Sequence, residues 1–175
     1  MKKILFILVV FLFAFGNSKA QFTAQNHYLG PCIGLSFLGS TPQFGANYEY
    51  GMDLKDIGRV GIGGIFRYWS YSEGYFAGNW SYTNILIGAQ GNYHFKLDKS
   101  KFDPWLGITL AYDAGSVKWD GPSGHNYASP TYGGLFFGAN AGSRYWLSPT
   151  LAVSARVGFG SLSYGALDVG VDFKF

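Results

Sequence analysis

The sequence contains a single cysteine, Cys32, and few charged residues, and both shortages exclude classes of protein. One cysteine allows no intramolecular disulfide and supplies no cysteine cluster for zinc. We interpret Cys32 as a small buried residue. Charged residues make up 13% of the chain, about half of the usual share. Lysine and glutamate, which favour exposed helices, are too scarce for a helical soluble domain.

The chain also lacks a basic patch once its first twenty residues are set apart. Without Lys2, Lys3 and Lys19 the 13 basic residues fall to 10, which matches the 10 acidic residues. No run of lysine or arginine remains that could contact a phosphate backbone. The composition therefore excludes nucleic acid as a partner.

The first twenty residues have the pattern of an export signal. Lys2-Lys3 precedes an apolar run from Ile4 to Phe15, and Ser18-Lys19-Ala20 places small residues where a signal peptidase cleaves. This run is shorter than the about 20 residues that a membrane-spanning helix needs, and no later segment is apolar enough. We predict a cleaved signal peptide at 1–20, Sec-dependent export, and one mature domain at 21–175. An uncleaved N-terminal anchor is the alternative.

Hydrophobic residues recur with a period of two over most of the mature chain. Near the C-terminus Leu167, Val169 and Val171 alternate with Asp168 and Gly170. One face is apolar and the other is glycine, small polar or charged, as in strands that separate two environments. Abundant glycine, 26 of 175 residues, and 19% aromatic residues are typical of such strands in a membrane barrel. We predict eight strands, at about residues 28–38, 43–52, 58–69, 81–97, 104–115, 132–146, 150–160 and 165–175.

Turn chemistry predicts two unlike ends for this sheet. Short polar connections lie at 53–56, 98–101 and 148–150, whereas longer loops rich in glycine, serine and aromatic residues lie at about 70–80 and 116–131. Short turns at one end and some long loops at the other are typical of outer-membrane barrels. Pro31 cannot donate a backbone hydrogen bond, so we expect either a bulge there or a later start of the first strand.

The apolar face is expected to meet lipid. Its polar counterpart is mostly glycine, serine, asparagine and alanine, which fill a narrow lumen, rather than the lysine and glutamate of a soluble surface. A soluble β-protein with an aromatic core is the alternative. Two aromatic bands are predicted. They comprise Tyr28, Tyr50, Tyr93, Trp105, Tyr145 and Phe175 at the periplasmic end, and Phe44, Tyr68, Tyr82, Tyr132 and Tyr164 at the outer end.

The chain ends in DVGVDFKF, in which Asp168, Gly170, Phe173 and Phe175 form a polar, glycine, aromatic, aromatic pattern. This pattern is similar to the signal that the barrel-assembly machinery recognises. Together with the export signal and the eight alternating segments, it makes the chain resemble the small eight-stranded outer-membrane β-barrels (OmpA-, OmpX- and OmpW-like). The resemblance covers about residues 21–175. It implies an all-β, antiparallel, up-and-down transmembrane barrel in the outer membrane of a Gram-negative-type bacterium, with both termini in the periplasm.

Charged residues of the polar face are predicted to form a network that fills the lumen, because buried charges must be paired. The candidates are Glu49, Arg59, Arg67, Asp113, Arg144, Arg156 and Asp168. A turn at 161–163 would place Arg156 opposite Asp168, and the hairpin at 53–57 would bring Glu49 and Arg59 together. A narrow channel for small or hydrophobic solutes is the alternative to a filled lumen.

The outer loops carry the candidate binding residues. Aromatic and histidine side chains there could stack on sugars, contact a partner protein, or rest on lipopolysaccharide head groups. They are Tyr71, Tyr75, Phe76 and Trp80 in one loop and Trp119, His125 and Tyr127 in the other. We predict a structural or surface-binding protein that contacts outer-membrane lipid and lipopolysaccharide and has an unknown surface ligand.

Enzymatic activity is not predicted. No residue spacing indicates a metal site, a cofactor or a catalytic centre. Asp120, Ser123 and His125 share one loop and approach the residue types of lipid A-modifying barrels, so a lipid A hydrolase or acyltransferase stays as an alternative.

Overall fold

The structure is a computed structural model that describes residues 22–76, 78–97, 101–121 and 131–175. Nine strands and one short 3-10 helix make up the described chain. The elements are β1 (His27–Ser36), η1 (Leu38–Ser40), β2 (Thr41–Leu54), β3 (Gly58–Tyr75), β4 (Gly78–His94), β5 (Phe102–Asp113), β6 (Ser116–Asp120), β7 (Gly134–Trp146), β8 (Leu151–Gly160) and β9 (Gly165–Lys174). No helix among these residues is long and apolar enough to cross a membrane.

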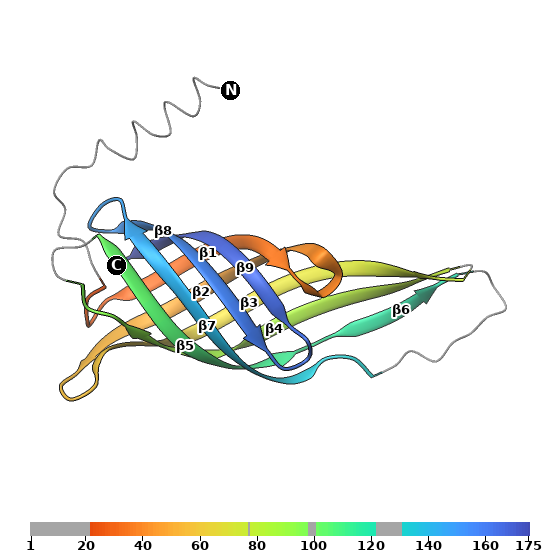
Figure 1. Cartoon of the computed structure of the whole chain (residues 1–175), viewed down its shortest axis with the longest axis horizontal. Helices are drawn as coiled ribbons and strands as arrows, with labels where there is room; N and C mark the ends of the chain where they lie inside the picture. The colour runs from red at the N-terminus through yellow and green to blue at the C-terminus, as the bar shows by residue number, and fades with distance from the viewer. Residues whose placement is uncertain (1–21, 77, 98–100, 122–130) are drawn as a thin grey trace, which may run out of the picture.

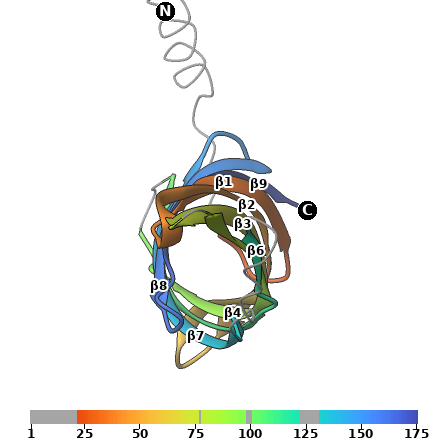
Figure 2. The ribbon, with the colours of Figure 1, turned by 90° about the vertical axis from the view of Figure 1, so that its right-hand side faces the viewer.

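The strands close into one antiparallel barrel, because β1 pairs with both β2 and β9 (Figures 1 and 2). Every other neighbouring pair follows chain order, so the topology is up-and-down. β5 and β6 pair with β4 in one continuous register, which is interrupted only at Ala114 and Gly115. The two therefore count as one strand of the barrel. The predicted eight-stranded barrel is therefore confirmed. Closure removes the unpaired sheet edge that hydrocarbon would not tolerate.

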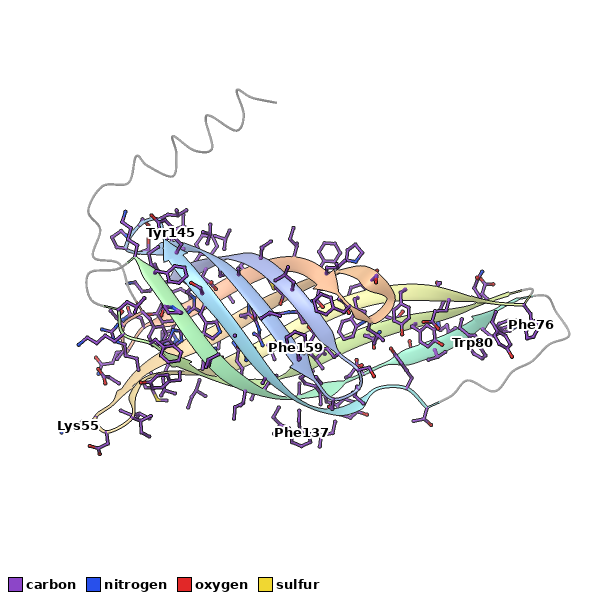
Figure 3. All side chains as sticks on the ribbon, in the orientation of Figure 1. Lys55, Phe76, Trp80, Phe137, Tyr145 and Phe159 are labelled. Carbon is purple, nitrogen blue, oxygen red and sulfur yellow. The ribbon has the colours of Figure 1, made fainter. Side chains whose placement is uncertain are left out.

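The alternation of the sequence separates the two sides of the wall. Large apolar side chains point outward, among them Ile108, which is 72% exposed, and Phe137 and Phe159 (Figure 3). Polar and charged side chains point inward and are buried, including Glu49 and Arg67. A soluble β-protein would show the opposite arrangement, so the outward apolar band favours a lipid-facing wall.

Pro31 is accommodated without the predicted bulge or late start. β1 begins at His27, and its register against β9 runs on without an extra residue, from Leu29 opposite Phe173 to Cys32 opposite Gly170. Only the pairings of Gly30 and Pro31 with β9 are missing, whereas Pro31 pairs normally with Ala46 of β2. The lost donor therefore interrupts the ladder on one side of the strand and leaves the strand continuous.

The predicted loop at 70–80 is wrong, because β3 and β4 continue as a paired hairpin to Tyr75 and Gly78. β6 adds a third strand beside this part of β4. The three-stranded extension projects far beyond the rest of the barrel (Figure 1). We call it the blade and define it as Ser70–Tyr75, Gly78–Thr83 and β6. At the opposite end β4 stops at His94, three residues before the predicted end of that strand.

Several residues assigned to the aromatic bands lie elsewhere. Tyr28, Trp105 and Tyr164 are 1%, 6% and 8% exposed and lie inside the barrel. Tyr28 is an even number of residues from the buried Cys32 in β1, and Trp105 is an even number from the buried Asp103 in β5, so both side chains point inward. Proximity to a strand end does not predict that a ring faces lipid. Tyr82 belongs to the blade, where its ring contacts that of Tyr132, which precedes β7. Residues Tyr50, Tyr93, Tyr145 and Phe175 at one end, and Phe44 and Tyr68 at the other, do lie on the outward face.

Candidate functional site

Arg144 of β7 is the centre of a buried ion-pair network near the end of the barrel where Phe22 and Phe175 lie. Its guanidinium donates to Glu49 Oε2 at 2.6 Å and to Asp172 Oδ2 at 3.1 Å, and lies 3.6 Å from Asp103 Oδ2. All four side chains are nearly inaccessible to solvent. Four strands are therefore tied together across the lumen by one cation, and each carboxylate is held by an opposite charge.

His94 of β4 completes this network. Its Nε2 lies 3.0 Å from Glu49 Oε1 and its Nδ1 lies 2.8 Å from Asp103 Oδ1. A neutral imidazole donates from one nitrogen only, so both contacts are satisfied by the imidazolium form facing two ionised carboxylates. Arg144 and His94 then set two positive charges against Glu49, Asp103 and Asp172.

A second polar group fills the middle of the lumen. Arg67 forms an ion pair with Asp168, with its Nη2 2.8 Å from Oδ2, and Gln43 also donates to this carboxylate. Arg156 stands opposite Asp168 in the β8–β9 register as predicted, yet its guanidinium bonds elsewhere. It donates to neutral acceptors, namely Gln90 Oε1 at 2.6 Å, Asn47 Oδ1 at 3.1 Å and Thr109 Oγ1 at 3.3 Å. The expected Arg156–Asp168 pair is thus replaced by Arg67–Asp168, because Arg67 reaches across the barrel from β3.

Two other lumen predictions need correction. Glu49 and Arg59 do not pair; Glu49 turns to Arg144 and His94, and Arg59 is only partly buried near the end of the barrel. Asp113 is buried at the opposite end beside Asn84, whose side-chain amide, when turned with its nitrogen toward Asp113, donates to Oδ2 at 2.9 Å. Asp113 therefore contributes to an amide contact and not to the ion-pair network.

Apolar clusters close the lumen on both sides of the charged middle. Toward the blade the cluster comprises Trp69, Leu86, Ala111, Phe136, Tyr164 and Ala166. Toward the chain termini it comprises Phe22, Tyr28, Trp146 and Ala152. A small cavity between them, beside Arg156 and Asp172, has a volume of about 10 Å³, which is room for roughly one water molecule. Side chains therefore occupy most of the described lumen.

Phe22 is the functional residue that the sequence analysis missed. It is fully buried and stacks on the His94 ring, with centroids 3.7 Å apart and planes 5° apart, and also on Tyr28 at 4.9 Å. Backbone bonds from Gln25 and Gly51 hold this segment against β2, and the Tyr28 hydroxyl donates to Thr23 O at 2.9 Å. We call Phe22–Asn26 the plug. Strand alternation does not indicate Phe22 as a lumen residue, because the plug precedes the first strand.

Because Gly61 has no side chain, the Glu49 carboxylate can occupy the space beside its Cα. A Cβ at this position would overlap the Glu49 carboxylate, which cannot move freely between Arg144 and His94. We therefore expect Gly61→Ala to lower the free energy of unfolding by about 1–3 kcal/mol. Urea unfolding of the folded barrel in detergent measures this loss.

The matched control is Gly91→Ala, since a Cβ at Gly91 meets no atom within 4 Å. It should be neutral or slightly stabilising. Equal losses in the two variants would contradict a role for Gly61 in seating Glu49.

The two faces of the blade have the opposite polarity to the two faces of the barrel wall that it extends. Its inner face, which continues the lumen side past Trp69, is largely aromatic and comprises Tyr71, Glu73, Tyr75, Gly78, Trp80, Tyr82, Val117 and Trp119. Its outer face, which continues the lipid side past Tyr68, is hydroxyl- and amide-rich and comprises Ser70, Ser72, Gly74, Asn79, Ser81, Thr83, Ser116, Lys118 and Asp120. The outward change from apolar to hydroxyl side chains marks where the wall leaves hydrocarbon.

Rings on the inner face form two groups, one near the barrel mouth and one near the tip. Tyr71 and Tyr82 stack at 4.7 Å, and the Tyr71 hydroxyl lies 3.0 Å from that of Tyr132. Farther out, Trp80 and Trp119 contact each other at 5.1 Å. Trp80 and Phe76 lie at the far end of the molecule from Lys55 (Figure 3).

Of the predicted outer-loop residues, Tyr75, Trp80 and Trp119 therefore come together on one sheet. His125, Tyr127 and Ser123 lie outside the described residues. Asp120 is an exposed residue near the tip of β6, on the outer face. No group of histidine, cysteine, aspartate and glutamate within the described chain is arranged to hold a metal ion.

The residues of the C-terminal pattern lie on β9 or directly after it. Phe173 and Phe175 are outward and exposed, Asp168 is buried, and Gly170 faces the lumen against Cys32 and Ser154. The last backbone amide bonds to His27 O and so joins the C-terminus to β1. Recognition of this pattern by the assembly machinery stays a prediction.

Known protein structures share this architecture. No family model and no curated protein matches the sequence. The outer membrane protein OprG from Pseudomonas aeruginosa aligns with a TM-score of 0.60 at 12% identity, over 90% of this chain and 99% of that chain. The N-terminal barrel domain of OprF from the same organism aligns at 0.58 and 15%, over 87% and 98%. The chain has the fold of the small eight-stranded outer-membrane β-barrels. Ail of Yersinia pestis, solved with the heparin analogue sucrose octasulfate, shares this fold at 0.56 and 14% identity, over 87% and 100%.

Proposed function

We propose that this outer-membrane-type barrel is a sealed surface protein: the barrel anchors the chain in the outer membrane, and the blade binds a ligand outside the cell. The observation that carries the proposal is the filled lumen. A buried network around Arg144, closed by apolar clusters on both sides, leaves a cavity of about 10 Å³. Such an interior gives rigidity and offers no conducting path.

The blade supports the second half of the proposal. A sheet that projects beyond the barrel adds nothing to membrane anchoring, and exposed rings such as Tyr75, which is 48% exposed, have no core to stabilise (Figure 1). Aromatic side chains on a rigid scaffold are a common means of ligand recognition. We infer that the hydroxyl-rich outer face contacts the sugars of surrounding lipopolysaccharide, because it continues the lipid-facing wall outward.

The channel and the lipid A-modifying enzyme are the competing functions. A channel would require the Arg144 network and at least one apolar cluster to move aside. An enzyme would require a catalytic group near the outer leaflet, whereas the buried His94 lies at the opposite end among carboxylates and arginine. The filled interior therefore favours a surface protein over a channel, and the position of His94 gives no support to an enzyme.

Ion conductance across planar bilayers tests the sealed lumen. We expect the purified, folded protein to produce no stable conductance steps at neutral pH, because the described interior holds room for about one water molecule. Reproducible single-channel steps in the unmodified protein would contradict the proposal and favour the narrow channel. A changed lipid A mass in cells that express the chain would favour the enzyme.

A further inference from the structure

We propose that the inner face of the blade binds a neutral oligosaccharide. Its sugar rings stack on Trp80 and Tyr75, and the Glu73 carboxylate accepts a hydrogen bond from a sugar hydroxyl. This inference rests on the proposed surface-binding role and names the class of ligand. Three properties of the face lead to it: its size, its charge and the arrangement of its rings.

The face is too small to hold a protein partner alone. Three strands about 4.8 Å apart and four residue steps of about 3.3 Å give an area on the order of 200 Å². A stable protein interface buries about 800 Å² on each partner. A short chain of sugars, lying along the strands, matches the dimensions of the face.

Charge excludes acidic sugars. Glu73 is the one charged side chain on the inner face of the described blade, and Lys118 and Asp120 lie on the outer face. A sulfated or carboxylated sugar would approach a carboxylate with no cation on the same face, so like charges would repel. Burial, together with the Tyr132 hydroxyl, raises the pKa of Tyr71, so this phenol stays neutral and can donate a hydrogen bond.

The rings pack on one another and are partly exposed, with Trp80 and Trp119 half-buried and Tyr75 exposed. Trp119 rests over Gly78, where a Cβ would overlap its indole, and Trp80 packs on Trp119 at 5.1 Å. Tyr75 stands edge-on to Trp119 at 6.4 Å. A row of flat apolar surfaces beside a carboxylate and a phenol suits the apolar faces and hydroxyl edges of pyranose rings.

Tryptophan quenching provides a direct test. Trp69, Trp105 and Trp146 are buried in the barrel, so acrylamide should reach mainly the blade residues Trp80 and Trp119. The full chain, folded in detergent, is titrated with maltohexaose, cellohexaose and chitohexaose, and separately with a heparin hexasaccharide. We expect at least one neutral sugar to reduce acrylamide quenching, with an effect that saturates as sugar is added. The heparin hexasaccharide should leave the quenching unchanged.

Three variants locate the site. Trp80→Ala is expected to lower the affinity for the neutral sugar about tenfold, and Glu73→Gln about fivefold. Ser81→Ala, on the outer face of the same strand as Trp80, should leave the affinity unchanged. Gel mobility before and after boiling shows that each variant is folded. If Trp80→Ala does not fold, Glu73→Gln still tests whether the sugar binds to the inner face.

Three results would overturn the inference: no protection by any of the three neutral sugars, tighter binding of the heparin hexasaccharide, or equal weakening by Ser81→Ala. A protein that binds none of these sugars and conducts no ions refutes the inference and leaves the sealed barrel intact. Conductance of the unmodified protein would instead refute the proposed function itself.

Discussion

Replacing Arg144 by methionine is expected to lower the free energy of unfolding by about 3–5 kcal/mol, the largest loss of any single change in the lumen. The methionine fills most of the arginine volume but leaves Glu49, Asp103 and Asp172 buried without the cation that they share. His94 alone then faces these three buried carboxylates, so negative charge is left uncompensated in a dry interior. Urea unfolding in detergent, followed by tryptophan emission, measures the loss.

Arg156→Met is the matched control. Arg156 is equally enclosed, but its hydrogen bonds go to the neutral acceptors Gln90, Asn47 and Thr109. Its removal leaves no carboxylate without its ion pair, so we expect less than half of the loss seen for Arg144→Met. Equal losses would mean that the burial of an arginine, and not the charge that it balances, determines stability.

Phe22→Ala is expected to release the plug and expose His94 to solvent. Burying a phenylalanine side chain contributes about 2–3 kcal/mol, so its loss should raise the open population tenfold or more. The barrel itself should stay folded, because the plug precedes β1 and can detach locally. The rate at which diethyl pyrocarbonate modifies His94, followed by peptide mass spectrometry, measures this opening.

Phe95→Ala serves as the comparison, since Phe95 follows His94 directly but is 42% exposed on the outer side of the wall. Its loss should leave the modification rate of His94 unchanged. An unchanged rate in Phe22→Ala would show that Phe22 does not seal this end of the barrel.

The barrel wall was predictable because a strand offers only two faces. A period of two assigns each residue of β2, β4 and β9 to lipid or lumen from the sequence alone, and Glu49, Arg67, Arg144, Arg156 and Asp168 all lie inside as their parity indicates. The same rule also places Asp103 and Asp172 inside. The predicted strand at 104–115 excludes Asp103, because β5 begins two residues earlier, at Phe102, and alternation alone does not indicate that Asp172 joins the ion-pair network.

Which charges pair could not be predicted from parity. Register defines neighbours along the wall, and it correctly sets Arg156 opposite Asp168. Long side chains cross the lumen, however, so Arg67 of β3 reaches Asp168 of β9 and Arg144 of β7 reaches Glu49 of β2. These contacts depend on barrel diameter and on the absence of a Cβ at positions such as Gly61.

The blade shows the limit of composition as a guide to loops. Residues 70–80 are rich in glycine, serine and aromatic residues, which is typical of a loop, yet cross-strand rings such as Tyr71 and Tyr82 hold them as a hairpin. Their alternation was present in the sequence. This alternation does not continue the pattern of the wall, because the polar and apolar faces exchange sides at the barrel rim.

The sequence by itself determined that this protein is a closed lipid-facing β-barrel, because the two-residue period and the composition of its two faces are local properties of the chain. Only the tertiary structure decided how charged and aromatic side chains fill the lumen, that Phe22 stacks on His94, and that the aromatic residues of the blade share one inner face. These features join residues from distant strands, and their distances are set by how the barrel closes. The sealed lumen and the blade, which carry the proposed function, are therefore products of closure.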